Sequence, residues 1–136
     1  MGKSHLAQAL GYELIKRQKT VFYRSVFDVI TDLFQLELED YTKILNRYLK
    51  CDLLIIDDMG IKQLPPKSAE YLFEIVMRRY EVRSTLMTSN RPLEEWGKLL
   101  GDVPATTAIL DRFLHHAKII TIAGRSYRLK DRSPAE

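Results

Sequence analysis

The sequence has little of several features that would set it apart from ordinary globular proteins. It contains one cysteine, Cys51, in 136 residues, and a single thiol cannot form a disulfide within the chain. No apolar run approaches the roughly 20 residues that span a bilayer. No basic and apolar leader precedes the first predicted helix. We therefore expect a protein of a reducing compartment, the cytoplasm, that has no membrane partner.

Neither sign of charge dominates the chain. Lys and Arg number 21 against 18 Asp and Glu, which gives a formal charge of +3, and hydrophobic residues make up 46%. Such a composition is typical of a soluble globular domain, and its mild basic excess is compatible with nucleic-acid contact without demonstrating it. A basic stretch around Tyr127 near the C-terminus is able to touch a phosphate backbone, although a solvated face is the simpler explanation. Its members are Arg125, Arg128, Lys130 and Arg132.

Helical and strand patterns alternate along the chain. Apolar spacing predicts helices within residues 4–19, 26–34, 41–50, 69–80, 92–100 and 105–116. Strands are expected at residues 20–25, 53–56, 84–90 and 118–123, and a terminal hairpin after Gly124. The pattern predicts an α/β fold with a parallel sheet between helices. We interpret residues 1–130 as one domain, with a helical insertion at 26–50, and residues 131–136 as a polar tail.

The chain opens with "MGKSHLAQAL", in which Gly2, Lys3 and Ser4 precede an apolar helical run. A complete phosphate-binding loop has a glycine, four further residues and then Gly-Lys-Ser or Gly-Lys-Thr between a strand and a helix. Its backbone N–H groups and the helix N-terminus converge on phosphate oxygens. Only the last three residues of that pattern are present, so a glycine turn with a serine N-cap is an equally simple explanation.

Two acids follow the most apolar run in the sequence. Asp57 and Asp58 end the segment "CDLLIIDD", and ligands of open parallel sheets bind at the carboxyl ends of the strands. Phosphoryl chemistry needs an acid there to hold Mg²⁺ and commonly a second group to orient the attacking water. Asp57 suits the first role and Asp58 the second. The alternative is a pair of acids that begins a solvated loop.

Two further residues are candidates for the same chemistry. Asn90 follows the next apolar strand in "TSNRP" and is expected to face the same crevice, although these residue types also begin helices. Arg112 lies off the apolar stripe of its helix, where it can reach the nucleotide of a neighbouring subunit as an arginine finger. A solvated arginine is the alternative.

Other candidate sites are weaker. His5, His115 and His116 lack metal-ligand spacing with Cys51, so no zinc site is predicted. Cys51 precedes an apolar strand and is expected to be a small buried residue rather than a nucleophile.

Taken together, "GKSHLA", "LLIIDDMG", "YLFEIVMRRYEVRSTLMTSNRPLEEWGKLLGD" and "TAILDRFLHHAKIITIAGRSYRLKDR" resemble the IstB family of AAA+ ATPases, which are helper proteins of insertion-sequence transposition. This family is similar to the DnaC and DnaI helicase loaders, and residues 26–50 look like the extra helical element of that clade. The resemblance implies the three-layer α/β/α fold of P-loop NTPases, with ATP and Mg²⁺ as cofactors. It also implies DNA, a transposase and further copies of the chain as partners.

The resemblance assigns a role to each candidate residue. It implies that Gly2, Lys3 and Ser4 bind the phosphates, Lys3 at the β- and γ-phosphates, and that Ser4 and Asp57 form the magnesium site. Asp58 takes the place of the catalytic acid, Asn90 that of the first sensor and Arg112 that of the arginine finger. Asp58 stands where many relatives have glutamate, and its shorter side chain predicts slow turnover. The helical lid that many AAA+ proteins carry is not visible after Ala123.

The beginning of the family's pattern is not found in this sequence. The first strand and most of the Walker A loop are missing, and that strand normally lies centrally, between the fourth and the fifth. We therefore hypothesise a truncated or misannotated reading frame, whose last strand closes the gap or whose sheet edge pairs with another copy. An incomplete phosphate cradle also predicts weak ATP binding by this chain.

Three functions remain open from the sequence. The first is a DNA-dependent ATPase helper of transposition. The second is a replicative helicase loader, which shares every motif quoted and would have a helicase as its partner. The third is a catalytically silent fragment that binds DNA or protein.

Overall fold

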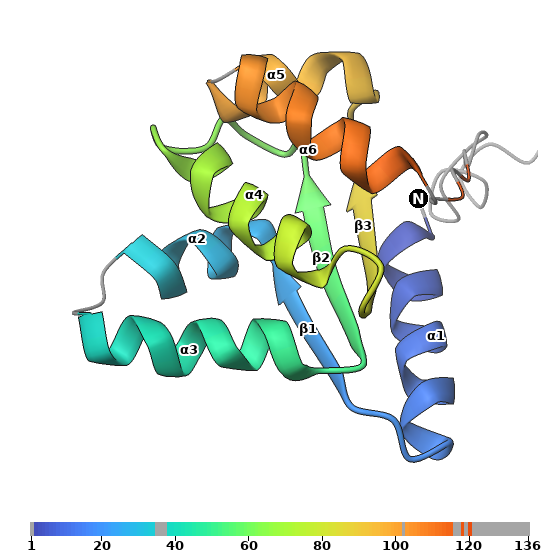
Figure 1. Cartoon of the computed structure of the whole chain (residues 1–136). Helices are drawn as coiled ribbons and strands as arrows, with labels where there is room; N and C mark the ends of the chain where they lie inside the picture. The colour runs from blue at the N-terminus through green and yellow to red at the C-terminus, as the bar shows by residue number, and fades with distance from the viewer. Residues whose placement is uncertain (1, 35–37, 102, 116–117, 119, 121–136) are drawn as a thin grey trace, which may run out of the picture.

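The computed structural model of the chain describes residues 2–34, 38–101 and 103–115, together with residues 118 and 120. Three strands form one parallel sheet in the order β1-β2-β3 (Figure 1). They are β1 (Val21–Ser25), β2 (Leu53–Met59) and β3 (Ser84–Ser89). The helices are α1 (Lys3–Lys16), α2 (Val26–Phe34), α3 (Leu38–Lys50), α4 (Ser68–Arg79), η1 (Leu93–Glu95), α5 (Trp96–Leu100) and α6 (Val103–His115).

The predicted α/β class and the parallel sheet are confirmed, and so is the pair of helices between the first two strands. Two boundaries differ from the expectation. Helix α1 ends at Lys16 instead of near residue 19, because the chain turns at Gln18 with a φ of 63°. The helix expected at 92–100 is divided into η1 and α5. No helix in the described part of the chain is long and apolar enough to cross a bilayer.

The strand expected at residues 118–123 lies outside the described residues, apart from Lys118 and Ile120. The same holds for the hairpin after Gly124, the basic stretch around Tyr127 and the polar tail. The three described strands lie at the first three of the four expected positions, residues 20–25, 53–56 and 84–90.

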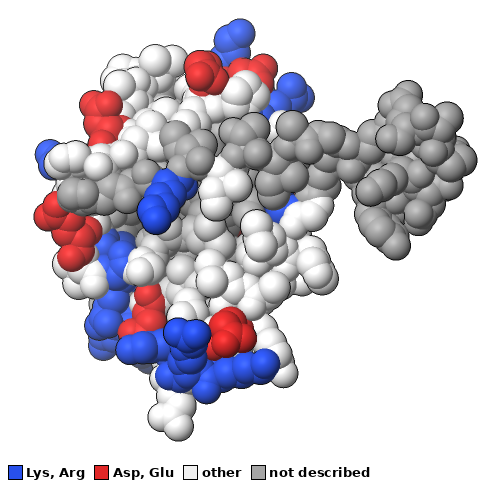
Figure 2. Space-filling model, turned by 90° about the vertical axis from the view of Figure 1, so that its right-hand side faces the viewer, with Lys and Arg blue, Asp and Glu red and all other residues white. Residues whose placement is uncertain are grey.

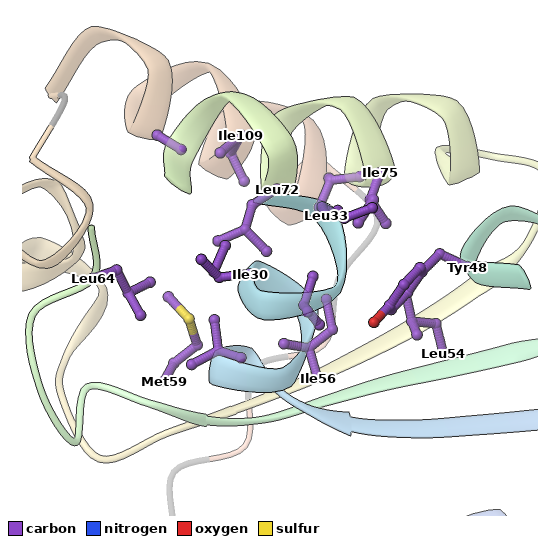
Figure 3. Packing of buried hydrophobic residues seen from close by; sticks show 14 of the residues in the cluster. Ile30, Leu33, Tyr48, Leu54, Ile56, Met59, Leu64, Leu72, Ile75 and Ile109 are labelled. Atoms are coloured by element: carbon purple, nitrogen blue, oxygen red, sulfur yellow. The ribbon is translucent and has the colours of Figure 1, made fainter. Parts of the chain in front are cut away.

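The alternating side chains of β2 serve two different layers. Leu54 and Ile56 face the helices α2, α3, α4 and α6, in a core that Figure 3 shows from close by. Leu53 and Ile55 face α1 on the other side of the sheet, where Ala7 is also buried. Each fully buried Leu or Ile side chain contributes roughly 1.5–3 kcal/mol. This strand is apolar on both faces because helices cover both faces.

The layer formed by α1 is thin. Its buried residues are the small Ala7 and Gly11, and a Cβ at Gly11 would lie 3.2 Å from both Ile55 and Val21. The glycine thus lets the helix approach the sheet closely. Figure 2 shows the face of the molecule that carries α1, where many Lys and Arg side chains lie toward the lower end and others lie with acids along the upper edge. Lys16 and Arg17, at the C-terminal end of α1, both lie near Glu13.

Helix α2 follows β1 without a loop. The backbone N–H of Asp28 donates to Ser25 Oγ at 3.1 Å, and the N–H of Ser25 donates to Asp28 Oδ2 at 3.4 Å. These reciprocal bonds are a capping box, which satisfies N–H groups at the helix start. The last residue of β1 therefore also begins α2, and the strand ends at a fixed point.

One buried arginine joins four elements at the opposite end of the sheet from this capping box. Arg79 is 1% exposed, and its guanidinium donates to the backbone oxygens of Tyr48, Cys51 and Ser84 at 2.7, 2.9 and 2.6 Å. The cost of burying the charge is offset by these bonds to carbonyl dipoles. Arg79 thereby ties the end of α4 to the end of α3 and to the starts of β2 and β3.

Candidate functional site

An irregularity in β2 separates the two acids from the apolar core. Ile56 pairs with Met87 and Met59 pairs with Ser89, so β2 uses one residue more than β3 over this stretch. Asp58 takes a φ of 70° at this bulge. With strict alternation, Asp58 would face the same core as Ile56. Because of the extra residue, Met59 faces this core instead and is 0% exposed. Bulges are frequent beside active sites because they redirect side chains in this way.

The carboxylate of Asp57 is held by hydroxyl groups from both neighbouring strands. Tyr23 in β1 donates to Oδ2, and Thr88 in β3 donates to Oδ1. Burial disfavours the charged form, yet the hydrogen bonds from Thr88, Tyr23 and Ser4 outweigh it and lower the pKa of Asp57. Asp57 is therefore a carboxylate at neutral pH, although its residue is only 1% exposed.

The pKa of Asp58 moves in the opposite direction. Its partial burial and the negative charges of Asp57 and Asp28 raise the pKa of this carboxyl. Its backbone N–H donates to Thr88 Oγ1 at 3.1 Å, so Thr88 holds the bulge as well as Asp57. Two adjacent acids with opposite pKa shifts are a common arrangement at catalytic sites.

The N-terminus of α1 lies beside these acids, at the carboxyl ends of the strands (Figure 1). Gly2 is the N-cap of α1, with a φ of 27° and no side-chain cap, so the serine-cap explanation of Ser4 does not apply. Lys3 Nζ donates to the backbone oxygen of Ser89 at 2.7 Å. The start of the 14-residue helix, the ammonium group and the Ser4 hydroxyl together favour an anion.

A tight turn holds Asn90 at the end of β3. The Asn90 N–H donates to the backbone oxygen of Met59 at 2.8 Å. Ser89 Oγ accepts from the Arg91 N–H at 3.0 Å and from the indole N–H of the buried Trp96 at 3.1 Å. The N-cap of the following turn is Pro92, without a side-chain bond. The Asn90 side chain is thus not used as a helix cap.

These residues line one cavity of about 190 Å³. Its lining comprises Gly2, Lys3, Ser4, His5, Asp57, Asp58, Thr88 and Asn90. The volume is below the range of pockets that enclose complete small-molecule ligands, and it fits the phosphate end of a nucleotide. The sequence-predicted residues of the phosphate loop, the two acids and Asn90 are therefore brought together by the structure.

A larger hollow of about 420 Å³ lies between α2 and the segment that precedes α4. It is lined by Phe27, Ile30, Thr31, Lys62, Gln63, Leu64 and Pro65. Lys62 is the one charged residue of this lining, and its ammonium group lies 4.9 Å from the centre of the Phe27 ring. Because the lining carries no acid, this hollow lacks the groups that phosphoryl chemistry needs.

Arg112 does not line the cavity. It is exposed on α6, and its guanidinium carbon lies 5.9 Å from the centre of the Tyr80 ring. Cys51 is free and buried, as expected. Among the described residues there is no group of three or more His, Cys, Asp and Glu side chains that could hold a metal ion. A cation at this site would therefore need oxygen ligands from elsewhere, as Mg²⁺ commonly takes from water and phosphate.

Sequence reasoning missed Tyr23, Thr88 and Trp96. The alternation of side chains along β3 could have indicated Thr88, because residues 86 and 88 lie on the same face of that strand and residue 88 is near its carboxyl end. Tyr23 gave no such signal because its partner lies 34 residues away. His5 was considered only as a zinc ligand, whereas it lines the cavity.

Comparison with known proteins gives consistent similarities. The model of the family described as "IstB-like ATP binding protein" matches residues 1–135. A protein of insertion sequence IS5376 from Geobacillus stearothermophilus, named for ATP binding, is 41% identical over 133 residues. The match covers 97% of this chain and 53% of that protein. The corresponding protein of IS21 from Pseudomonas aeruginosa is 35% identical, with 99% and 51% covered. The chain thus spans about half the length of these curated relatives.

Solved structures of replication initiators are similar in fold. DnaA from Aquifex aeolicus with bound AMPPCP aligns with a TM-score of 0.66 and 25% identity, over 79% of this chain and 34% of that one. The replication initiator DnaA bound to AMPPCP and single-stranded DNA aligns with a TM-score of 0.65, also at 25% identity and over the same shares of the two chains.

Proposed function

Because the chain belongs to the family of IstB-like ATP-binding proteins, we propose that it is the nucleotide-binding part of a helper ATPase of insertion-sequence transposition. The observation that carries the proposal is the cavity that Lys3, Ser4, Asp57 and Asn90 share at the carboxyl ends of the strands. DNA, a transposase and further copies of the chain are the partners that this function requires. They belong to the proposal, since the chain spans about half of its relatives.

The proposed phosphate contacts come from the start of α1. Lys3 neutralises charge on the β- and γ-phosphates, and it exchanges its bond with the Ser89 oxygen for phosphate oxygens. The N–H groups in the first turn of α1 would donate to the same oxygens. These residues bind and orient the triphosphate and take no proton from it.

The donors around Asp57 fit a magnesium ion. Ser4 and Asp57 offer hydroxyl and carboxylate oxygens, which are the ligands that Mg²⁺ prefers, and the other ligands would be water and phosphate oxygens. Bound Mg²⁺ supplies charge neutralisation on the phosphoryl oxygens. Ser4 is able to donate to Asp57 and accept the cation at once, because a hydroxyl has one hydrogen and two lone pairs.

Asp58 and Asn90 are proposed to act on the attacking water. The raised pKa of Asp58 makes it a better proton acceptor than an ordinary aspartate once a water lies against it. Asn90 follows the turn that Ser89 and Trp96 hold, and its amide would orient that water or contact the γ-phosphate. Arg112 is not among the residues that line the cavity, and its proposed role is at the nucleotide of a neighbouring subunit.

Transposition is favoured over replication by the relatives. The curated relatives cited above are proteins of insertion sequences, whereas the likeness to DnaA lies in the fold at 25% identity. A helicase loader shares the same cavity residues and differs in its partner. A pull-down separates these two functions. The purified chain is mixed with the transposase or with the replicative helicase encoded in the same genome, and the partner that it retains identifies the function.

The proposed function is tested with the chain and with a version extended at its N-terminus to complete the phosphate loop. We expect Mg-ATP binding in both, weak in the first, and DNA-stimulated hydrolysis in the second. Asp57→Asn should abolish hydrolysis, while Asp111→Asn on the exposed face of α6 should not. Equal hydrolysis by the extended chain with and without the Asp57→Asn substitution would contradict the proposal. No hydrolysis by the extended chain would favour a silent binding fragment.

A further inference from the structure

Both oxygens of the Asp57 carboxylate accept a hydrogen bond in the empty cavity. Tyr23 and Thr88 donate one hydroxyl each, to different oxygens. An ionised carboxyl group has about four acceptor positions on its two oxygens, and it has no hydrogen of its own to donate. A cation, or a water bound to it, therefore has to share Asp57 with these two hydroxyl groups or displace one of them.

Thr88 cannot leave easily. It has a short side chain near the end of β3, and its Oγ1 also accepts the backbone N–H of Asp58 at 3.1 Å. That N–H belongs to the bulge of β2. Thr88 is therefore fixed by a second bond besides the one to Asp57.

Tyr23 differs from Thr88. It lies on β1 opposite Ile55, two residues before the position opposite Asp57, so its ring reaches along the sheet to the acid. The residue is 36% exposed, and a rotation about its side-chain bonds takes the hydroxyl into water. There it recovers a hydrogen bond, so its departure costs less than that of Thr88.

We propose that Tyr23 is a gate on the cation position, which holds Asp57 when the cavity is empty and withdraws when a divalent cation arrives with a nucleotide. This inference rests on the proposed function, because it requires that Asp57 serve a cation. It gives Tyr23 the opposite effect from Thr88. Removal of the Tyr23 hydroxyl favours cation binding, whereas removal of the Thr88 hydroxyl loosens Asp57 and the bulge and disfavours it.

The test is the affinity for Mn²⁺ in the presence of ADP, measured by the loss of the free-ion signal in electron paramagnetic resonance. We expect Tyr23→Phe to tighten Mn²⁺ binding by about threefold to tenfold, since it removes a competing bond to a charged group. Thr88→Val should weaken it. Tyr41→Phe is the matched control, because the Tyr41 hydroxyl also donates to a carboxylate, that of Glu74, at 2.9 Å and away from the cavity.

The outcomes separate this inference from the proposed function. If Asp57→Asn abolishes Mn²⁺ binding and Tyr23→Phe leaves it unchanged or weakens it, Tyr23 is not a gate and the cation site stands. If Asp57→Asn binds Mn²⁺ as well as the unchanged chain does, the cation site itself is wrong. A third outcome is that neither the unchanged chain nor Tyr23→Phe binds Mn²⁺ detectably at millimolar concentration. That outcome would contradict the gate and the cation site. Circular dichroism of each variant checks that it has folded.

Discussion

The ammonium group of Lys3 donates a hydrogen bond of 2.7 Å to the backbone oxygen of Ser89, 86 residues further along the chain. This bond links the first turn of α1 to the end of β3. It also places a positive charge next to Asn90 and opposite Asp57, in the cavity that all three line. An ammonium group held by a single carbonyl is free to exchange that carbonyl for phosphate.

Lys3→Ala should lower nucleotide affinity with little loss of stability. Lys3 is the one Lys or Arg in the lining of the cavity among the described residues, and we expect its removal to weaken Mg-ADP binding about tenfold by calorimetry. Lys16→Ala is the control, because Lys16 lies on the same helix, at its exposed end beside Glu13. An equal effect of both substitutions would mean that Lys3 acts only through net charge.

Asp58→Asn should stabilise the fold at neutral pH. Burial and the charges of Asp57 and Asp28 raise the pKa of Asp58, so the fold favours its protonated form. The stability that Asp58 contributes is therefore complete below its ordinary pKa of 3.8 and is lost as pH rises through the folded value. The substitution should add up to about 1 kcal/mol at pH 7 and progressively less as pH falls toward 3.

The measurement is urea unfolding of Asp58→Asn and of the unchanged chain between pH 3 and pH 8. Asp111→Asn, an exposed carboxyl on α6, should show no comparable trend. A gain in stability that stayed constant down to pH 3 would have to come from the bulge backbone, since asparagine also adopts a positive φ readily, and the electrostatic explanation would be wrong.

Gly60→Ala should disturb the turn that holds Asn90. Gly60 has a φ of 96°, and a Cβ there would lie 2.5 Å from Arg91 Cγ and 3.1 Å from the Arg91 backbone N. We expect a loss of about 2–3 kcal/mol in the free energy of unfolding, together with weaker nucleotide binding. The steric clash adds to the cost of the positive φ.

Gly101→Ala separates these two costs. Gly101 also has a positive φ, of 71°, but nothing lies within 4 Å of a Cβ built on it. Its substitution should cost only about 1 kcal/mol and leave nucleotide binding unchanged. Equal losses for the two alanine variants in thermal unfolding would show that the Arg91 contact is unimportant.

Arg79→Met should destabilise the whole domain. It retains much of the side-chain volume but leaves the backbone oxygens of Tyr48, Cys51 and Ser84 without their donor. Unpaired buried acceptors are costly, so we expect a loss of about 3 kcal/mol or more in urea unfolding. Arg78→Met is the matched control, because Arg78 is exposed and pairs with the partly exposed Glu74 at 3.4 Å. A similar small effect from both would contradict the role of Arg79.

Much of the fold could be predicted from the sequence because the signals were local. The apolar run 53–56 predicted β2, and the helical stripes predicted α2, α3 and α4. The position of Asp57 and Asp58 at the carboxyl end followed from the direction of a parallel strand. The bulge was beyond prediction, because it depends on the pairing of Met59 with Ser89 across strands.

The missing parts of the prediction have a common physical cause. Tyr23 and Arg79 act through contacts that join residues more than 25 positions apart, and such contacts leave no periodicity in a single sequence. In "VFYRS" the tyrosine appeared only as a residue with strand propensity. Its bond to Asp57 became visible once β1 and β2 were paired in register.

The most direct test of the account is to map where Mg-ADP binds by the changes in backbone amide signals in nuclear magnetic resonance spectra. The account predicts that the amides of Lys3, Ser4, Asp57, Thr88 and Asn90 move together, with one saturation curve, and that Asp57→Asn removes the response. Changes centred instead on the larger hollow at Phe27, Lys62 and Leu64 would contradict it.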